Sequence, residues 1–329
     1  MTRFMFVTGG KERKDGYKLK EWHRFECGLI LKIDIDKQEA TECVRYVSPT
    51  EVCPEEKPSI LFKSATLKNN KFYVCTSTEI IIFSFPEFEQ IGYISIPIFN
   101  DIHHVLPSIN GNIIVVNTGL DMVVEVDPSG KVIHEWSVIG ENIWERFSKE
   151  IDYRKVPTTK PHKSHPNYAF YIKDSLWATR FEQKDAICLE DSSKRINIEI
   201  GHPHDGVVKG DFVYFTTVNG YIVVANTSTL KIEEIYDLNE ITQADIALGW
   251  CRGIHILEED KIWVGFSRLR PTVFQNHINW IKGKFGLKDW RNLPTRIVEY
   301  DLTKKEVIKE INLERFGLNT VFSLHFVKY

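Results

Sequence analysis

The 329-residue chain is 43% apolar and 26% charged, with 42 basic and 45 acidic side chains, as in an ordinary folded protein. Its formal net charge of −3 argues against a general nucleic-acid-binding protein, and no apolar run approaches the roughly eighteen residues of a membrane-spanning helix. The N-terminus lacks the cleavage site of a secretory signal, and the six cysteines are scattered without a CxxC pair. We therefore expect a cytoplasmic protein with free thiols and no structural zinc knuckle.

Six times along the chain, a β-rich run meets a short polar turn and is followed by a second β-rich run. Val, Ile, Tyr and Phe dominate the runs, whereas Asp, Asn, Pro, Ser, Gly and Lys fill the turns, a pattern typical of β-hairpins. We interpret the six hairpins as the third and fourth strands of six blades. In chain order they span residues 28–47, 79–96, 122–136, 186–200, 221–238 and 296–313.

Another hairpin precedes five of these six units and predicts the first two strands of each blade. The sixth pair is split between the ends of the chain, because residues 323–329 would pair with residues 2–8. A blade built from both ends closes a ring and leaves no free sheet edge. The five complete hairpins span residues 64–78, 103–118, 168–180, 204–217 and 253–267.

This pattern predicts an all-β fold, a six-bladed β-propeller that forms a single domain over residues 1–329. A β-sandwich and two small β domains are the alternatives. Helical patterns of consequence occur only in residues 141–151 and 273–290. The second of these mixes aromatic residues with lysines, which fits a lid over the propeller, a homodimer contact or an amphipathic strip at a membrane surface, and we favour the lid.

Long insertions fall on the connections that a propeller places on one face. These connections join the second strand to the third or lead into the next blade, whereas the turns on the opposite face are only a few residues long. We expect the insertions to cover a mouth, because long irregular connections in compact domains are usually functional. They span residues 9–28, 48–60, 139–167 and 268–295.

Three of these insertions carry a net positive charge. Residues 268–295 hold six basic residues against one acidic residue, and residues 9–28 and 139–167 each hold six against four. A basic rim raises the local concentration of anions, so this face favours a small anionic or polar substrate. The alternative is that the lysine-rich loops are simply solvated.

Histidines stand near the start of the innermost strand in five of the six predicted blades. Neutral imidazoles that converge from several strands bind Zn²⁺ or Fe²⁺, and the metal would polarise a substrate oxygen or lower the pKa of a bound water. Asp205 and Asp101, each close to a histidine in sequence, would orient the ligand rings. The histidines are His103 or His104, His165, His202 or His204, His255 and His325.

A metal-free alternative makes one histidine the nucleophile or the general acid–base group. Arginines would then neutralise the anionic group that is transferred, because a guanidinium matches sulfate, phosphate or carboxylate. The candidates are Arg252, which directly precedes Gly253, and Arg180 at the end of a predicted second strand.

Two stretches resemble the arylsulfotransferase propellers. One is DIHHVLPSINGNIIVVNTGLDMVVEVDPSGKVIHEW, with paired histidines before an LPNGN-like turn, and the other is HPNYAFYIKDSLWATR, which is similar to the family's His-x-Asn followed by a terminal Arg. In that family the histidine and the arginine of the second segment handle the sulfuryl group. The resemblance covers roughly residues 100–190 and implies this role for His165, Asn167 and Arg180.

More widely, the repeats resemble six-bladed propellers of the NHL and gluconolactonase-like kind. Among these, the peptide-amidating lyase domain holds zinc through three histidines from different blades. His104, His204 and His325 fall on alternate predicted blades, so the resemblance implies a zinc site built from them. The Glu/Asn/Asp metal pattern of the gluconolactonases is not evident in the sequence.

No P-loop, GxGxxG before a helix, GxSxG elbow or HExxH motif occurs, which argues against ATP or NAD chemistry and against common hydrolase mechanisms. We predict a metal-dependent enzyme of lyase, hydrolase or oxygenase type that holds Zn or Fe. A metal-free transferase centred on His165 is the second hypothesis, and a non-catalytic scaffold that binds a partner on the lid face is the third. The predicted metal ligands are His104, His204, His255 and His325, and the predicted catalytic residues are His165, Arg180, Arg252 and Asp205.

Overall fold

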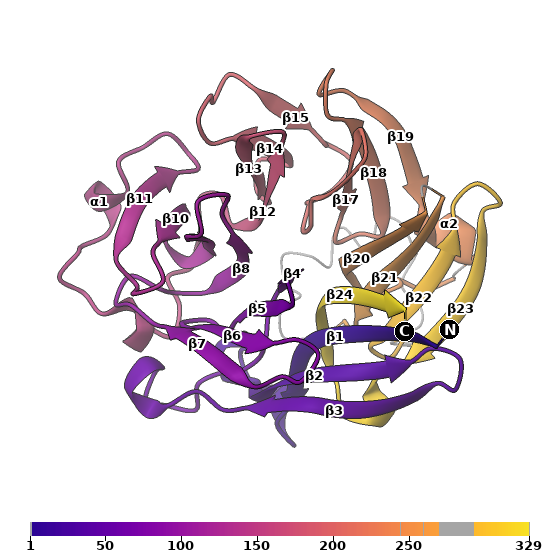
Figure 1. Cartoon of the computed structure of the whole chain (residues 1–329), viewed down its shortest axis with the longest axis horizontal. Helices are drawn as coiled ribbons and strands as arrows, with labels where there is room; N and C mark the ends of the chain where they lie inside the picture. The colour runs from indigo at the N-terminus through magenta and orange to yellow at the C-terminus, as the bar shows by residue number, and fades with distance from the viewer. Residues whose placement is uncertain (1, 244, 259, 270–292, 329) are drawn as a thin grey trace.

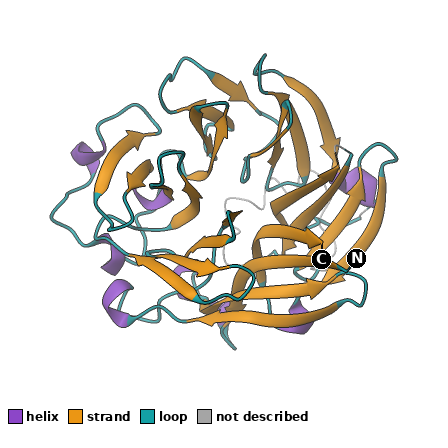
Figure 2. Ribbon diagram, viewed as in Figure 1, coloured by secondary structure: helices purple, strands orange, loops and turns teal. Residues whose placement is uncertain are grey.

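The computed structural model describes residues 2–243, 245–258, 260–269 and 293–328, and its strands form six four-stranded antiparallel sheets. The sheets are arranged as blades around a common centre, with one strand of each blade innermost (Figure 1, Figure 2). The six-bladed β-propeller predicted from the repeats is therefore confirmed. All six cysteines are free thiols, as expected.

Five blades each use four strands that follow one another along the chain, and every predicted hairpin is present. Three of them consist, from the innermost strand outward, of β4–β7 (Thr66–Lys68, Lys71–Cys75, Ile80–Ser84, Gln90–Ile94), β8–β11 (Ile102–Pro107, Ile113–Asn117, Met122–Val126, Val132–Ser137) and β12–β15 (Pro166–Ile172, Ser175–Arg180, Asp185–Cys188, Arg195–Asn197). The other two consist of β16–β19 (Val207–Lys209, Phe212–Thr216, Tyr221–Asn226, Ile232–Asp237) and β20–β23 (Trp250–Glu258, Lys261–Ser267, Arg296–Asp301, Glu306–Asn312).

The sixth blade is assembled from both ends of the chain, as predicted. Its innermost strand is β24 (Thr320–Lys328), which pairs with β1 (Arg3–Glu12) in antiparallel register. β2 (Phe25–Asp34) and β3 (Glu39–Tyr46) complete the blade outward. The C-terminal strand therefore lies inside the N-terminal one and closes the ring.

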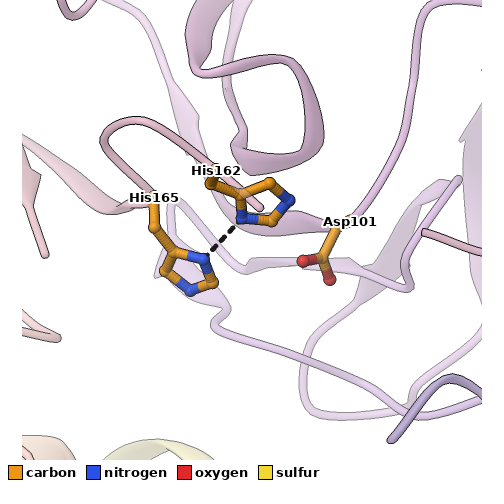
Figure 3. Close-up of side chains that lie close together, drawn as sticks. All are labelled: Asp101, His162 and His165. Carbon is orange, nitrogen blue, oxygen red and sulfur yellow. Dashed lines mark hydrogen bonds between the residues drawn. The ribbon is translucent and has the colours of Figure 1, made fainter. Parts of the chain in front are cut away.

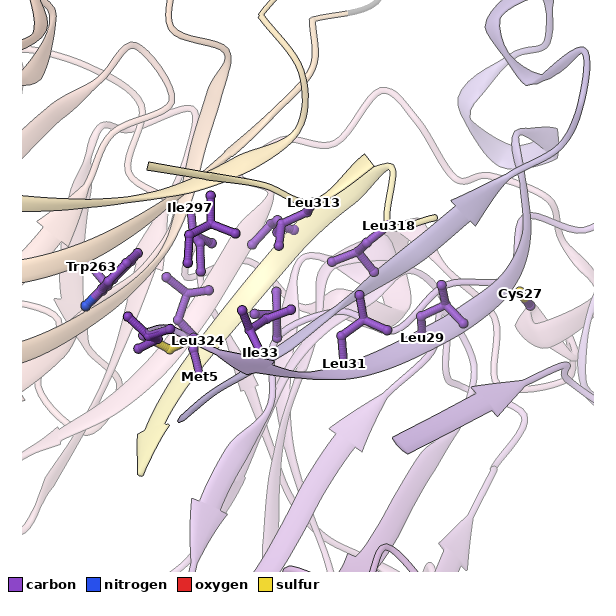
Figure 4. Packing of buried hydrophobic residues seen from close by; sticks show 14 residues of the cluster. Met5, Cys27, Leu29, Leu31, Ile33, Trp263, Ile297, Leu313, Leu318 and Leu324 are labelled. Carbon is purple, nitrogen blue, oxygen red and sulfur yellow. The ribbon is translucent and has the colours of Figure 1, made fainter. Parts of the chain in front are cut away.

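Apolar side chains hold this closing seam together. Met5 and Leu324 of the paired strands are buried with Leu31 from β2, and they pack against Trp263 and Ile297 of the neighbouring blade (Figure 4). Because these residues belong to one contiguous core, opening the ring would expose apolar surface from two blades.

The middle strands of a blade are buried on both faces because neighbouring blades cover them. All five residues of β9 are buried, and β10 has one residue that is not, whereas no residue of the outer strand β11 is buried. This difference explains why the sequences of the second and third strands are continuous apolar runs, whereas those of the fourth strands mix apolar and polar residues.

The described insertions lie on connections that the strand order places on one face of the propeller. β1 and β2 extend into the predicted insertion 9–28, so the connection itself spans only residues 13–24. The insertion between β11 and β12 contains the short helix α1 (Ile143–Arg146), and α2 (Leu238–Thr242) follows β19. Most of the predicted insertion 268–295, with its helical segment 273–290, lies outside the described residues. Within the described ranges, no helix is long and apolar enough to span a membrane.

Candidate functional site

A cavity of about 520 Å³ lies on the face of the propeller that carries the insertions. Its wall combines residues next to the innermost strands with residues from the connections 13–24, 47–65 and 138–165. Residues of the described insertions thus contribute to the wall of this cavity. The polar and charged side chains in the wall include Glu21, Lys63, Asp101, His103, Lys160, His162, His165, Asn167, His204 and Arg252.

Asp101, His162 and His165 form a compact group in this cavity, with one ligand atom of each within 4.8 Å of the others (Figure 3). The Nδ1 atoms of His162 and His165 are 2.7 Å apart, a hydrogen bond in which one ring must donate and the other accept. Two imidazoles and a carboxylate are donors that suit Zn²⁺ and Fe²⁺. Among the described residues, this is the single cluster of three or more His, Cys, Asp or Glu side chains that is this compact.

The buried carboxylate of Asp121 positions the loop that carries both histidines. Its Oδ1 accepts hydrogen bonds from the N–H groups of Ser164 (2.9 Å) and His165 (2.8 Å), and its Oδ2 accepts one from the N–H of Lys163 (2.8 Å). His165 directly precedes β12 and has a φ of 55°, in the left-handed region that non-glycine residues rarely adopt. The hydrogen bonds to Asp121 hold the backbone in this conformation.

The charges around the cluster favour the metal-binding form of each side chain. Burial alone would raise the pKa of Asp101, but Lys63 and Lys160 hold it below its usual range. The ammonium of Lys63, which is only 4% exposed, pairs with Asp101 Oδ1 and leaves the second carboxylate oxygen available. Burial lowers the pKa values of His162 and His165, so both imidazoles are neutral at pH 7.

Two further imidazoles line the inner wall. His204 Nδ1 lies 3.3 Å from Asp205 Oδ1, and His103 Nδ1 lies 2.8 Å from the carbonyl oxygen of Asp101. The ring centroid of His103 is 4.9 Å from that of His165 and 6.2 Å from that of His204. Burial lowers the pKa of His103 and of His204, so neutral rings continue from the metal-binding cluster to the inner wall.

Arg252 lies beside the inner imidazoles. Its guanidinium carbon is 3.8 Å from the centroid of the Phe322 ring, and that ring is 5.9 Å from the ring of His204. The guanidinium also donates to Thr320 Oγ1 at 2.7 Å. Three residues predicted from the sequence therefore line one cavity, namely His165, His204 and Arg252. The predicted Asp205 contacts His204 from outside the cavity wall.

The other three predicted ligands lie outside the cavity wall. His104 is completely buried, stacks on Tyr168 with ring centroids 3.7 Å apart, and accepts a hydrogen bond from the N–H of Ala169. His255 packs against Phe326, and His325 packs edge-on against Phe72.

The predicted ligand set His104, His204, His255 and His325 is consequently not assembled. Within the described ranges, no three of these imidazoles have ligand atoms within 4.8 Å of one another. The reason is their depth along the channel, because a strand rises about 3.3 Å per residue. His204 precedes β16, whereas His255 and His325 are the sixth residues of β20 and β24.

Arg180 also lies outside the cavity wall and does not fit the predicted role of an anion clamp. Its guanidinium forms a two-point ion pair with Asp185, at 2.8 and 2.6 Å, and donates to the carbonyl of Val138 at 2.8 Å. The side chain is buried and ties β13 to β14 and to the end of the preceding blade.

Sequence reasoning missed His162 and Lys63. His162 lies in an insertion, where no strand period indicates the direction of a side chain, but the His-x-x-His spacing of His162 and His165 was an available signal. Lys63 lies just before β4, the innermost strand of its blade. It is buried because it pairs with Asp101, and no local sequence pattern predicts this pairing.

Many cations of the described insertions are paired with carboxylates, so fewer of them are available to attract an anion than the number of basic residues indicates. The pair between Lys160 and Glu21, at 2.7 Å, also links two insertions across the mouth. Further pairs in the described insertions are Arg146 with Asp121, Arg154 with Asp152, Lys163 with Glu141 and Arg24 with Glu12.

No family model and no curated protein sequence matches the chain. Solved structures do match: a protein of unknown function from Bacteroides caccae has a TM-score of 0.62 at 12% identity over 100% of both chains. A structure named as a streptogramin B lyase has a TM-score of 0.51 at 12% identity and covers 95% of this chain and 88% of its own. A candidate 6-phosphogluconolactonase from Bacteroides fragilis has a TM-score of 0.54 at 9% identity, over 99% and 98%.

At such identities, these structures show a shared fold and nothing further. The resemblances to arylsulfotransferases and to the peptide-amidating lyase domain are not tested by them and stay predictions.

Proposed function

We propose that this chain is a metal-dependent enzyme that acts on a small anionic or polar substrate in the axial cavity, by lyase or hydrolase chemistry. The observation that carries the proposal is the convergence of Asp101, His162 and His165 in a covered cavity of about 520 Å³. In this proposal the metal site predicted from the sequence remains at the same face but uses other ligands.

The donor set suits the proposed metal. The two imidazoles are neutral and Asp101 is ionised, so none of the three has to lose a proton to bind a cation near pH 7. A bound Zn²⁺ or Fe²⁺ would polarise a substrate oxygen or lower the pKa of a coordinated water.

The wall of the cavity supports the proposed substrate class. Lys63, Lys160 and Arg252 line it and favour an anionic or polar group, whereas Trp22 and Phe322 offer apolar surface beside them. The volume limits the substrate to a small molecule. Two of the solved structures that share the fold are named as a lyase and a candidate lactonase, which agrees with catalytic use of a propeller.

Metal analysis of two matched variants tests the proposal. Protein purified without an affinity tag should hold about one equivalent of Zn or Fe after reconstitution, measured by inductively coupled plasma mass spectrometry. His162→Ala/His165→Ala should lose this metal, and His255→Ala/His325→Ala, which removes two imidazoles outside the cavity wall, should keep it. A protein that binds no metal, or that loses it in the second variant alone, would overturn the proposed site.

A metal-free group transferase is the second candidate. The positive charge of Lys160 lowers the pKa of His165, and the charges of Lys63 and Lys160 lower the pKa of Asp101. The cavity therefore offers cations beside an imidazole even without Arg180. If no metal binds, incubation with aryl sulfates and phosphorylated donors should reveal a covalent adduct on His165 by mass spectrometry, and its absence would leave the scaffold hypothesis.

A further inference from the structure

One ion pair in the wall of the cavity joins two insertions. Glu21 belongs to the connection between β1 and β2, and Lys160 belongs to the connection between β11 and β12. The Lys160 ammonium is 2.7 Å from Oε2 of Glu21. Both residues line the cavity, and the side chains of Glu21 and Lys160 are 54% and 36% exposed. A solute in the cavity can therefore reach both partners of the pair.

Lys160 also lies near the proposed metal ligands. It precedes His162 by two positions in the same connection. Its positive charge lowers the pKa of His162, of His165 and of Asp101. The ammonium is thus close both to the carboxylate of Glu21 and to the group that would hold the metal. A molecule with one end on Lys160 would have its other atoms within reach of that group.

The backbone beside each partner is anchored independently of the pair. The carbonyl of Trp22, the residue after Glu21, accepts a hydrogen bond from the N–H of Ser59 at 3.0 Å. The hydroxyl of Thr159, the residue before Lys160, donates to a backbone carbonyl of the preceding blade. Rotation of the two side chains can therefore separate the pair while both insertions keep their positions.

The pair itself is weak enough for another ion to replace one of its partners. An ion pair between solvent-exposed side chains changes an equilibrium constant by no more than about fivefold. A cation that displaced Lys160 would meet the like charges of Lys63 and Arg252 in the same wall, whereas these charges attract an anion. The partner that exchanges is therefore Glu21, and the group that Lys160 already holds there is a carboxylate.

We propose that Lys160 binds a carboxylate of the substrate, and that Glu21 holds the same position until the substrate displaces it. The Glu21 side chain turns into solvent, and the substrate carboxylate takes its place beside the ammonium. Lys160 then fixes one end of the substrate near the metal-binding group. Glu21 determines specificity, because an uncharged molecule cannot replace it. The inference rests on the proposed function and narrows its substrate class to small carboxylates.

Nuclear magnetic resonance titration of the metal-free full-length chain tests the carboxylate site, because no ligand can then bind through a metal. The probes are succinate and succinamide, which have the same carbon chain and differ in charge. Succinamide should bind at least about tenfold more weakly than succinate. Lys160→Gln should weaken succinate binding by about tenfold, the loss expected for one hydrogen bond to a charged group.

Glu21→Gln separates displacement from simple attraction. It should strengthen succinate binding by up to about fivefold, because the competing carboxylate is gone. In the Lys160→Gln background the same substitution should change the affinity less than about twofold, since the position that Glu21 competes for no longer exists. Glu141→Gln is the matched control: Glu141 pairs with Lys163 of the same connection, both side chains are exposed, and neither lines the cavity. It should leave succinate binding unchanged.

Three results would overturn the inference. The first is equal affinity for succinate and succinamide, and the second is no succinate binding by the natural chain and by Glu21→Gln. The third is a gain from Glu21→Gln that is as large without Lys160 as with it, which would mean general repulsion. Failure of the proposed function is a different result, namely no metal bound at Asp101, His162 and His165 while the succinate pattern persists.

Discussion

Among single residues, Lys63 and Asp101 form the contact on which the candidate metal site depends most. The ammonium of Lys63 is almost completely buried, and Asp101 is the carboxylate that pairs with it. A buried charge that loses its partner destabilises a protein by about 3–5 kcal/mol, more than most single contacts contribute. Asp101 therefore has two roles, one in stability and one in binding, and substitutions can separate them.

Asp101→Asn should lower the free energy of unfolding by about 3 kcal/mol, because it leaves the Lys63 ammonium buried without a counter-charge. Asp101→Asn/Lys63→Met should recover most of this loss, since it removes the charge itself. Urea denaturation measures both effects. Neither variant should bind metal as tightly as the natural chain, and equal stability of the single and double variants would contradict the assignment of Lys63.

Between secondary-structure elements, Asp121 connects the third strand of one blade to the loop that leads into the next. It lies just before β10 and accepts three backbone N–H groups of residues 163–165. These N–H groups have no neighbouring strand to pair with. The carboxylate of Asp121 therefore takes the place of the strand-to-strand hydrogen bonds of a β-sheet at this point. The geometry of His162 and His165 is therefore set by a residue about forty positions earlier in the chain.

Asp121→Ala should release the loop, with faster hydrogen exchange in residues 158–168 and little change in β12 and β13. The expected loss of stability is about 2–4 kcal/mol, since several buried N–H groups lose their acceptor, and zinc affinity should fall with it. Asp127→Ala is the control, because Asp127 accepts two N–H groups in a turn outside the cavity. Equal effects of both substitutions on the loop would argue against this role of Asp121.

The contrast between strands and insertions also explains what the sequence could predict. A hairpin such as Met122–Val126 with Val132–Ser137 is recognisable because its apolar runs and its turn are local. The closure of the ring could be predicted because one β-rich run at each end of the chain had no hairpin partner of its own. By contrast, the ligand set depended on how deep His255 and His325 lie along their strands, and on the position of His162 in a loop, which only tertiary contacts determine.

For the molecule as a whole, the buried histidines make stability depend on pH. Burial lowers the pKa of His104 to about 3 and that of His255 to about 4, against about 6.5 in an unfolded chain. Between the folded and the unfolded pKa values, the unfolded state binds protons that the folded state does not. The contribution of these rings is complete above pH 6.5 and is lost as the pH falls toward 3.

The free energy of unfolding should therefore decrease between pH 6.5 and pH 5, where most carboxylates are still ionised. His104→Gln keeps an acceptor for the N–H of Ala169 and removes one titrating group, so its slope in this range should be smaller by up to about 1.4 kcal/mol per pH unit. Chemical denaturation at a series of pH values measures this slope. An unchanged slope would mean that His104 titrates normally in the folded protein.

The closing seam between β1 and β24 also has a consequence for how the protein is made. Among the described strands of the propeller, β1 leaves the ribosome first, yet its inner partner β24 is translated last. Until then β1 presents an unpaired edge to the cell, next to β2, and five finished blades cannot form a ring. The nascent chain must therefore keep this edge from pairing with other chains for the whole of its synthesis.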